Sequence, residues 1–184
     1  TLGSLYESQG RYEEAEPLLL RALEGTEKKL GPNHPSTLAS VGNLGLLYSS
    51  QGRYDEALPL FLRALEGKER TLGADHPSTL ISVGSLGSLY ESQGRYEESE
   101  PLYLRGLEVR ERTLGPDHLS TLTSVNNLAV LYKSQGRYDE ALPLYLRALE
   151  VRERTLGADH PDTLTSVVSL GFLYKSQGRY DEAL

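Results

Sequence analysis

Apolar residues along the chain recur at helical spacing, in pairs of stripes. The first stripe of one pair consists of Leu38, Val41, Leu44, Leu47 and Tyr48. Steps of three and four residues place such side chains on one face of a helix. The stripe ends at Gly52, and glycine can adopt the left-handed conformation that closes a helix. We therefore predict a helix over residues 38–50.

A second and longer stripe follows at once. It consists of Tyr54, Ala57, Leu58, Phe61, Leu62, Ala64 and Leu65, with Leu72 near its end. Gly73 terminates this stripe, and His76 and Pro77 then suit the cap and the first turn of the next helix. The two stripes predict a helical hairpin: a shorter helix, called helix A, a tight turn, and a longer helix, called helix B.

The hairpin is repeated along the whole chain. The tetrapeptide Gln-Gly-Arg-Tyr begins at Gln9, Gln51, Gln93, Gln135 and Gln177, a fixed period of 42 residues. Periods of this length mark arrays in which each unit stacks on its neighbours. We predict one solenoid over residues 1–184, with partial repeats at both ends and no unique segment left for a catalytic site.

Small and large residues hold fixed places in each repeat, which lets two helices approach closely. The order Leu44-Gly45, Tyr48, Gly52, Tyr54, Ala57, Phe61 and Ala64 resembles the tetratricopeptide repeat. Eight additional residues and the turn Leu-Gly-x-Asp-His-Pro are similar to the 42-residue variant found in kinesin light chain. The resemblance implies an all-α, right-handed superhelical solenoid of antiparallel helix pairs.

Two features of helix B need their own interpretation. Prolines fall in its second turn at Pro17, Pro59, Pro101 and Pro143. An interior proline removes one backbone hydrogen bond, so we expect a slight bend in each helix rather than a break. The basic residues Arg63, Lys68 and Arg70 alternate with Glu66 and Glu69. This alternation predicts a solvated face with local ion pairs.

Composition excludes several classes of function. The net charge of -7 argues against binding to nucleic acid or to an anionic membrane, because either needs a basic surface. The chain has no cysteine, which excludes disulfides and thiolate metal sites. No apolar run approaches the roughly 18 residues that span a bilayer. We therefore expect a cytoplasmic protein.

Candidate chemistry in the chain is repeated rather than unique. The histidines His34, His76, His118 and His160 occupy one equivalent position per repeat. A metal cluster would need them together, whereas the repeat separates them, so we interpret them as helix caps. Serine and aspartate recur in the same way at turns, so no single catalytic triad stands out. The sequence predicts no enzyme, no cofactor and no metal.

The family resemblance implies a concave groove, lined by the A helices, that holds an extended or helical peptide. Eleven candidate groove residues follow from it: Asn43, Leu46, Ser85, Glu91, Asn126, Asn127, Val130, Lys133, Ser169, Phe172 and Lys175. Residues 51–92 and 135–176 differ at eight positions, four of them in the groove. Either the groove has been adapted to a ligand, or exposed positions have drifted.

Charge in the groove is sparse. The only charged side chains placed there are Glu7 and Glu91 early in the chain and Lys133 and Lys175 late in it. Family members that clamp a carboxylate use several lysines and arginines on helix A, which argues against an acidic-tail ligand here. We expect amide hydrogen bonds from the asparagines and apolar contacts around Leu46, Val130 and Phe172.

Two functional hypotheses follow. The first is a non-catalytic scaffold that binds a peptide or protein segment in the groove. The second is a sensor or assembly module of a larger multidomain signalling protein whose catalytic domain lies outside this chain; the full-length sequence would distinguish them. The chain starts within a helix A and stops within a helix B, so we expect a piece of a longer array. Without polar outer faces its ends are expected to fray or to associate end to end.

Overall fold

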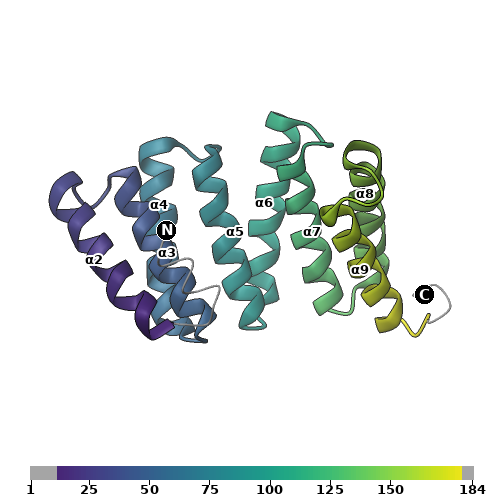
Figure 1. The fold of residues 1–184 in the computed structure, drawn as a ribbon, viewed down its shortest axis with the longest axis horizontal. Coiled ribbons are helices and arrows are strands. Elements are labelled where there is room, and N and C mark those ends of the chain that lie inside the picture. The colour runs from purple at the N-terminus through teal and green to yellow at the C-terminus, as the bar shows by residue number, and fades with distance from the viewer. Residues whose placement is uncertain (1–11, 180–184) are drawn as a thin grey trace. The chain divides into compact units, whose positions relative to one another are not determined.

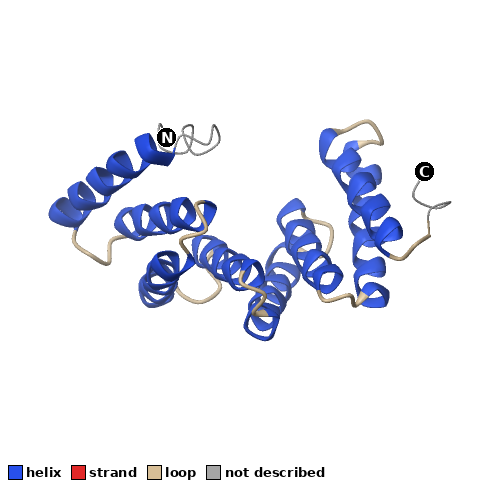
Figure 2. Cartoon of the chain, turned by 90° about the horizontal axis from the view of Figure 1, so that it is seen from below, coloured by secondary structure: helices blue, strands red, loops and turns tan. Residues whose placement is uncertain are grey.

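Helices account for most of the chain. The computed structural model describes residues 12–179, so expectations for Glu7, the first Gln-Gly-Arg-Tyr and both chain ends lie outside the described residues. The described helices are α2 (Tyr12–Leu30), α3 (Pro35–Ser50), α4 (Tyr54–Leu72), α5 (Pro77–Ser92), α6 (Tyr96–Leu114), α7 (Leu119–Ser134), α8 (Tyr138–Leu156) and α9 (Pro161–Ser176) (Figure 1). Turns and loops alone join these helices, and this part of the chain contains no strand (Figure 2).

The predicted hairpin is confirmed. Even-numbered helices are the B helices, with 19 residues each, and odd-numbered helices are the A helices, with 16. Contacts within the chain gather into two units, residues 1–95 and residues 96–184. In unit 1, α3 packs against both α2 and α4, and α5 packs against α4 and touches α3. In unit 2, α7 packs against α6 and α8, and α9 packs against α8. A continuous solenoid through both units stays a prediction.

Histidine caps begin the A helices. The Nδ1 atom of His34 accepts a hydrogen bond from the backbone N–H of Ser36 at 3.2 Å. The Nδ1 atoms of His76, His118 and His160 each accept the equivalent bond, from the N–H two residues later, at 3.1 Å. The interpretation of these histidines as caps is confirmed. Over residues 12–179, no three His, Cys, Asp or Glu side chains are grouped so that they could hold a metal ion.

Glycines close the helices as the sequence predicts. Gly52 has a φ of 73°, and the next residue, Arg53, donates its N–H to the carbonyl of Tyr48 at 2.8 Å. This backward bond satisfies a carbonyl of the last helical turn, which otherwise has no partner in the helix. The B helices run without interruption through Pro17, Pro59, Pro101 and Pro143, so the expectation that these prolines do not break them is confirmed.

Small residues allow the helices of unit 1 to pack closely. A Cβ atom added to Gly45 would lie 3.0 Å from the ring of Phe61, and one added to Gly67 would lie 2.5 Å from Leu38. Phe61 and Leu38 are both buried. A methyl group at Gly67 would require the Leu38 side chain to move, so the close contact between α3 and α4 at this place relies on glycine.

Each unit has its own core. In unit 2 it is built around Tyr145, which is 2% exposed, together with Val125, Leu128, Leu131, Ala148 and Leu173. These positions repeat those of Phe61, Val41, Leu44, Leu47, Ala64 and Leu89 in unit 1, all of which are buried. The repeat in sequence is therefore a repeat in packing.

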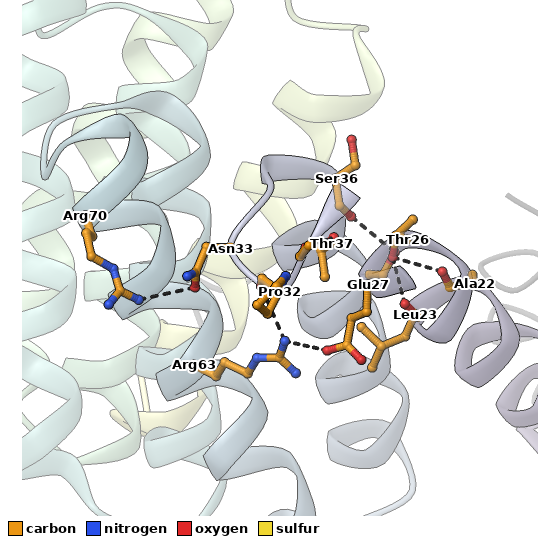
Figure 3. A network of polar contacts seen from close by, with 12 residues as sticks. Ala22, Leu23, Thr26, Glu27, Pro32, Asn33, Ser36, Thr37, Arg63 and Arg70 are labelled. Carbon is orange, nitrogen blue, oxygen red and sulfur yellow. Dashed lines mark hydrogen bonds and ion pairs between the residues drawn. The ribbon is translucent and has the colours of Figure 1, made fainter. Parts of the chain in front are cut away.

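Polar side chains of helix B reach the preceding repeat instead of pairing locally. Arg63 of α4 donates to Glu27 of α2 at 2.5 Å and to the carbonyl of Pro32 at 3.3 Å, while Arg70 donates to Asn33 at 3.3 Å (Figure 3). The prediction of local ion pairs was therefore wrong for these two arginines, which pair with the preceding repeat. Unit 2 repeats the arrangement with Arg147 on Glu111 and the Pro116 carbonyl, and with Arg154 on Asp117.

Candidate partner-binding face

The candidate residues lie on the outer side of the A helices. None of the eleven belongs to a core: Asn43, Leu46, Phe172 and Lys175 are exposed, and the others are half-buried. The structure places Asn43, Leu46, Ser85 and Glu91 in unit 1 and the remaining seven in unit 2. Each set is therefore described separately as the helix A face of its unit.

The helix A face of unit 2 is apolar and basic. Phe172 and Val168, one helical turn apart on α9, are 54% and 55% exposed. The Lys133 ammonium of α7 lies 5.5 Å from the centre of the Phe172 ring, within the range of a cation–π contact. This contact brings two predicted residues from neighbouring A helices together. Val130, three residues before Lys133 on α7, packs against the core of the unit.

Hydrogen-bonding groups accompany this apolar surface. Among the residues the structure describes, the side-chain amides of Asn126 and Asn127 have no hydrogen-bond partner. Ser169 differs, because its hydroxyl donates to the carbonyl of Thr165 in its own helix at 2.9 Å. The two half-buried asparagines are thus the groups on this face that can donate to and accept from a partner backbone.

The helix A face of unit 1 has a different character. Leu46 is 41% exposed on α3, and Ile81 is 61% exposed on α5. The place of Phe172 is taken by Ser88, and the place of Lys175 by Glu91. On α3 and α5, the described A helices of this unit, the face therefore offers scattered aliphatic groups and an acidic residue, with no exposed aromatic ring.

Sequence reasoning missed a cluster that fixes the turn between the A and B helices. Glu16 accepts hydrogen bonds from the Tyr48 hydroxyl at 3.0 Å and from Arg53 at 2.9 Å, and the Arg53 guanidinium lies over the Tyr48 ring. Burial, and then the bond to Glu16, raise the pKa of Tyr48. Unit 2 repeats the cluster with Glu100, Tyr132 and Arg137. The alternation of glutamate and leucine at Glu16, Leu58, Glu100 and Leu142 was the available signal.

A second correction concerns Lys68, which the sequence assigns to a solvated face. Its side chain is only 7% exposed, and its ammonium donates to the hydroxyl of Ser82 at 2.8 Å. Burial lowers its pKa. Arg110 and Arg152 repeat the contact with Ser124 and Ser166 in unit 2. These cations lie between the helices, so they support the A helices rather than line the candidate faces.

The fold and the faces define an all-α repeat protein, in which a repeated framework carries variable outer surfaces. Comparison with protein families identifies the family within this class. The tetratricopeptide repeat model matches residues 1–70, 42–105, 78–152 and 123–184, which together cover the whole chain. The chain belongs to the tetratricopeptide repeat family, and the fold class expected from the sequence is confirmed.

Solved structures show the same similarity over the full chain. The nearly identical TPR-like repeats of a protein described as a kinesin light chain of Podosopora anserina are 31% identical, with a TM-score of 0.81 over 99% of this chain and 86% of that one. BtubC (BKLC) from P. vanneervenii is 25% identical, with a TM-score of 0.82 over 99% of this chain and 72% of that one. The resemblance to kinesin-light-chain-like repeats is thereby confirmed.

A more distant structure shows the fold alone. MamA AMB-1 is 24% identical, with a TM-score of 0.59, over 99% of this chain and 89% of that one. None of the curated proteins compared with the chain matches it. Within residues 12–179, no helix combines the length and the apolar character needed to cross a bilayer.

Proposed function

We propose that this chain is a non-catalytic interaction scaffold that binds a peptide or protein segment on its helix A faces. Tetratricopeptide repeats generally mediate contacts between proteins, and the whole chain is built from them. The observation that supports the proposal most strongly is the helix A face of unit 2. There, exposed apolar side chains, a lysine and two half-buried amides without partners lie on neighbouring helices.

The chemistry of this face suits a segment with a large apolar side chain. Such a side chain would bury the exposed parts of Phe172 and Val168, and burial of apolar area favours binding. Asn126 and Asn127 would pair with backbone groups of the segment, because an amide both donates and accepts. Since α7 and α9 are already held by the core, the face needs little ordering on binding, which favours affinity.

Sequence differences between repeats support the choice of the helix A face. Residues 51–92 and 135–176 share their packing framework but exchange Ile81 for Thr165, Gly84 for Val168, Ser88 for Phe172, and Glu91 for Lys175. These four exchanges change size or charge on the outer side of α5 and α9. A scaffold that recognises a particular segment requires differences of this kind, because specificity is a difference of affinities.

A peptide-display selection against the 184-residue chain tests the proposal. Selected peptides are measured by fluorescence anisotropy against the chain and against Phe172→Ser, which installs the residue found at the equivalent position, Ser88. We expect Phe172→Ser to weaken binding about tenfold or more, because the largest exposed apolar group of the face is lost. The matched control is Leu146→Ser, because Leu146 is 43% exposed but lies on α8, outside the face.

Two results would contradict the proposal. One is a selection that yields no peptide with affinity above background. The other is a set of peptides whose binding Leu146→Ser weakens as much as Phe172→Ser does, since the helix A face would then have no special part in recognition.

A further inference from the structure

One residue of each B helix decides whether the turn after the next A helix holds a carboxylate. At this position α2 has Glu16 and α6 has Glu100, whereas α4 has Leu58. The turn concerned is the one after α5, and its residues lie within unit 1. The turn after α9 also follows a leucine, Leu142, but it borders residues outside the described range. The turn after α5 can therefore be compared with the two turns whose glutamate is present.

The turns with a glutamate show how the carboxylate is held. Oε1 of Glu16 accepts a hydrogen bond from the Tyr48 hydroxyl at 3.0 Å, and Oε2 accepts one from Nη1 of Arg53 at 2.9 Å. The cluster of Glu100 in unit 2 repeats both bonds, at 3.1 Å and 2.7 Å. A tyrosine and an arginine at these two places therefore bind the two oxygens of one carboxylate, and the bond from the arginine is charge-assisted.

The turn after α5 keeps both donors although its glutamate is missing. The Arg95 guanidinium lies 4.3 Å from the centre of the Tyr90 ring, compared with 3.9 Å and 4.0 Å in the two clusters. The backbone N–H of Arg95 donates to the carbonyl of Tyr90 at 2.8 Å, and its Nη1 donates to Gln93 at 3.2 Å. Because the turn itself holds the two donors together, a ligand would need to order little when it binds.

Leu58 leaves the acceptor side of this turn empty. A leucine side chain has no oxygen, so it cannot accept the bonds that Glu16 accepts. In the described part of the chain, the Tyr90 hydroxyl has no hydrogen-bond partner. Tyr90 is also half-buried, whereas Tyr48 and Tyr132 are buried. An acceptor from outside the chain can therefore reach the tyrosine of this turn.

The arginine of such a turn can bind several acceptors at once. Nε and Nη2 of Arg53 both donate to Glu56, while Nη1 donates to Gln51 and to Glu16. A guanidinium has five N–H donors, which is enough for all of these bonds. An arginine in this place can therefore keep its local partners and hold one further carboxylate at the same time.

We propose that Tyr90 and Arg95 form a binding site for a carboxylate supplied from outside the chain. The Tyr90 hydroxyl donates to one oxygen and Nη1 of Arg95 to the other, as the two clusters do with their own glutamates. The carboxylate belongs either to an acidic side chain of a partner protein or to a small free acid. Neither residue is among the eleven candidates on the helix A faces, so this site does not depend on the function proposed for those faces.

Nuclear magnetic resonance of the arginine side-chain Nε–Hε groups tests the site, with sodium acetate titrated into the isotope-labelled chain. Arg95→Lys identifies the Arg95 signal by its loss. We expect this signal to shift with acetate until the shift saturates, and to stay in place with sodium chloride at the same ionic strength. The signals of Arg53 and Arg137 should not respond to acetate, because each already holds a carboxylate of the chain.

Exchange of the residue that distinguishes the turns should exchange the response. Leu58→Glu supplies the missing carboxylate within the chain and is expected to abolish the acetate shift of Arg95. Its control is Leu58→Met, a long apolar side chain without an oxygen, which is expected to keep the shift. Glu16→Leu is expected to make Arg53 respond to acetate, because its built-in acceptor is removed. Circular dichroism checks that all three variants retain their helices.

Tyr90→Phe tests the second donor. It removes only the hydroxyl, so it is expected to weaken acetate binding about fivefold while the Arg95 signal still responds. Acetate binding of unchanged strength in Tyr90→Phe would overturn the assignment of the hydroxyl to the site.

Two capped peptides, Ala-Ala-Glu-Ala-Ala and Ala-Ala-Gln-Ala-Ala, distinguish the two sources of the carboxylate. The glutamate peptide is expected to shift the Arg95 signal and the glutamine peptide is not. Tighter binding of the glutamate peptide than of acetate supports a site for an acidic side chain, and equal binding supports a site for a free acid. The proposal is overturned if acetate leaves the Arg95 signal in place, if chloride moves it as far, if Leu58→Glu responds like the unmodified chain, or if both peptides bind equally.

Discussion

Units 1 and 2 build the same arrangement of four helices with different residues at matching places. At the close contact between an A helix and the following B helix, unit 1 has Gly45 and Gly67, whereas unit 2 has Ala129 and Val151. All four are buried. The buried aromatic residue of helix B also differs: it is Phe61, next to Gly45, in unit 1 and Tyr145 in unit 2.

The difference between the units teaches that framework and face obey different constraints. In the interior, the contact between an A helix and the following B helix accommodates either two glycines or an alanine and a valine. The helices nevertheless begin and end at equivalent residues of the repeat. Outside, the changes from Ser88 to Phe172 and from Glu91 to Lys175 alter size and charge without any core packing to preserve. Interior changes must fit their neighbours, whereas exterior changes are free to follow a partner.

The largest expected effect comes from moving an interior residue of unit 2 into unit 1. Gly67→Val places a side chain against Leu38, where even a Cβ atom would lie 2.5 Å away. Overpacking of this kind is expected to lower the free energy of unfolding by about 2 kcal/mol. Urea unfolding followed by circular dichroism measures it.

Gly25→Val is the control for that substitution, because the same change is made at an equivalent position with open space around it. Helix propensity then favours valine over glycine by a few tenths of a kcal/mol. Equal destabilisation by the two substitutions would show that the contact with Leu38 does not limit the packing of unit 1.

On the exterior, removal of two amides tests the face rather than the framework. Asn126→Ala combined with Asn127→Ala is expected to weaken a peptide selected on unit 2 about tenfold, or about 1.4 kcal/mol, while helicity is retained. Titration calorimetry and circular dichroism give the two readouts. Loss of helicity would place these asparagines in the framework and not in the face.

Within each unit, one B helix carries the glutamate of the cluster, Glu16 or Glu100, and the next B helix has leucine in its place. Glu16→Leu installs the residue found at Leu58 and removes the acceptor for Tyr48 and Arg53. The free energy of unfolding is expected to fall by about 1 kcal/mol. Glu100→Leu should match it in unit 2, because the cluster is the same. A change in one unit alone would show that the two clusters are not equivalent.

High pH tests the same clusters without mutation. The pKa values of Tyr48 and Tyr132 are raised above the ordinary value of 10.0, first by burial. The folded chain therefore holds these protons more tightly than the unfolded chain. Their contribution to stability is complete below about pH 10 and is lost as the pH rises through the folded pKa values. Ultraviolet titration should show a late tyrosine fraction that decreases in Glu16→Leu. An unchanged titration curve would show that Glu16 does not contribute to the raised pKa of Tyr48.

The smallest effect is expected at the exposed ion pairs that the arginine of each cluster makes with a glutamate three residues later. Arg53–Glu56 and Arg137–Glu140 are 2.7 Å and 2.6 Å long, and each arginine lowers the pKa of its partner carboxyl. Stability from these carboxylates is present above their unfolded pKa and is lost as the pH falls through the lowered value. Because water screens both pairs, Glu140→Gln should leave the unfolding midpoint at neutral pH unchanged. A clear shift would show that the pair is coupled to Glu100 through Arg137.

The fold was predictable because the same turn residues and the same core residues recur every 42 residues along the chain. Leu38, Val41 and Phe61 mark the framework by helical spacing alone. The cluster of Glu16, Tyr48 and Arg53 was missed, since Tyr48 and Arg53 lie 32 and 37 residues after Glu16, in another helix and in the turn that follows it. The burial of Lys68 was missed for a related reason: its place between helices depends on Ser82, in another helix.

The candidate face was predictable only as a set of exposed positions. Family resemblance located them on helix A, and the structure places all of them outside the cores. The contact between Lys133 and Phe172 joins two helices, so periodicity within one helix could not reveal it.

The most direct test of the account is a two-dimensional amide spectrum of the isotope-labelled chain, recorded with and without a peptide selected on it. If the helix A face of unit 2 is the binding site, the shifted amides should belong to residues 126–133 and 165–175, and they should stay in place when the peptide is titrated into Phe172→Ser. Shifts confined to the B helices, with α7 and α9 unaffected, would contradict it.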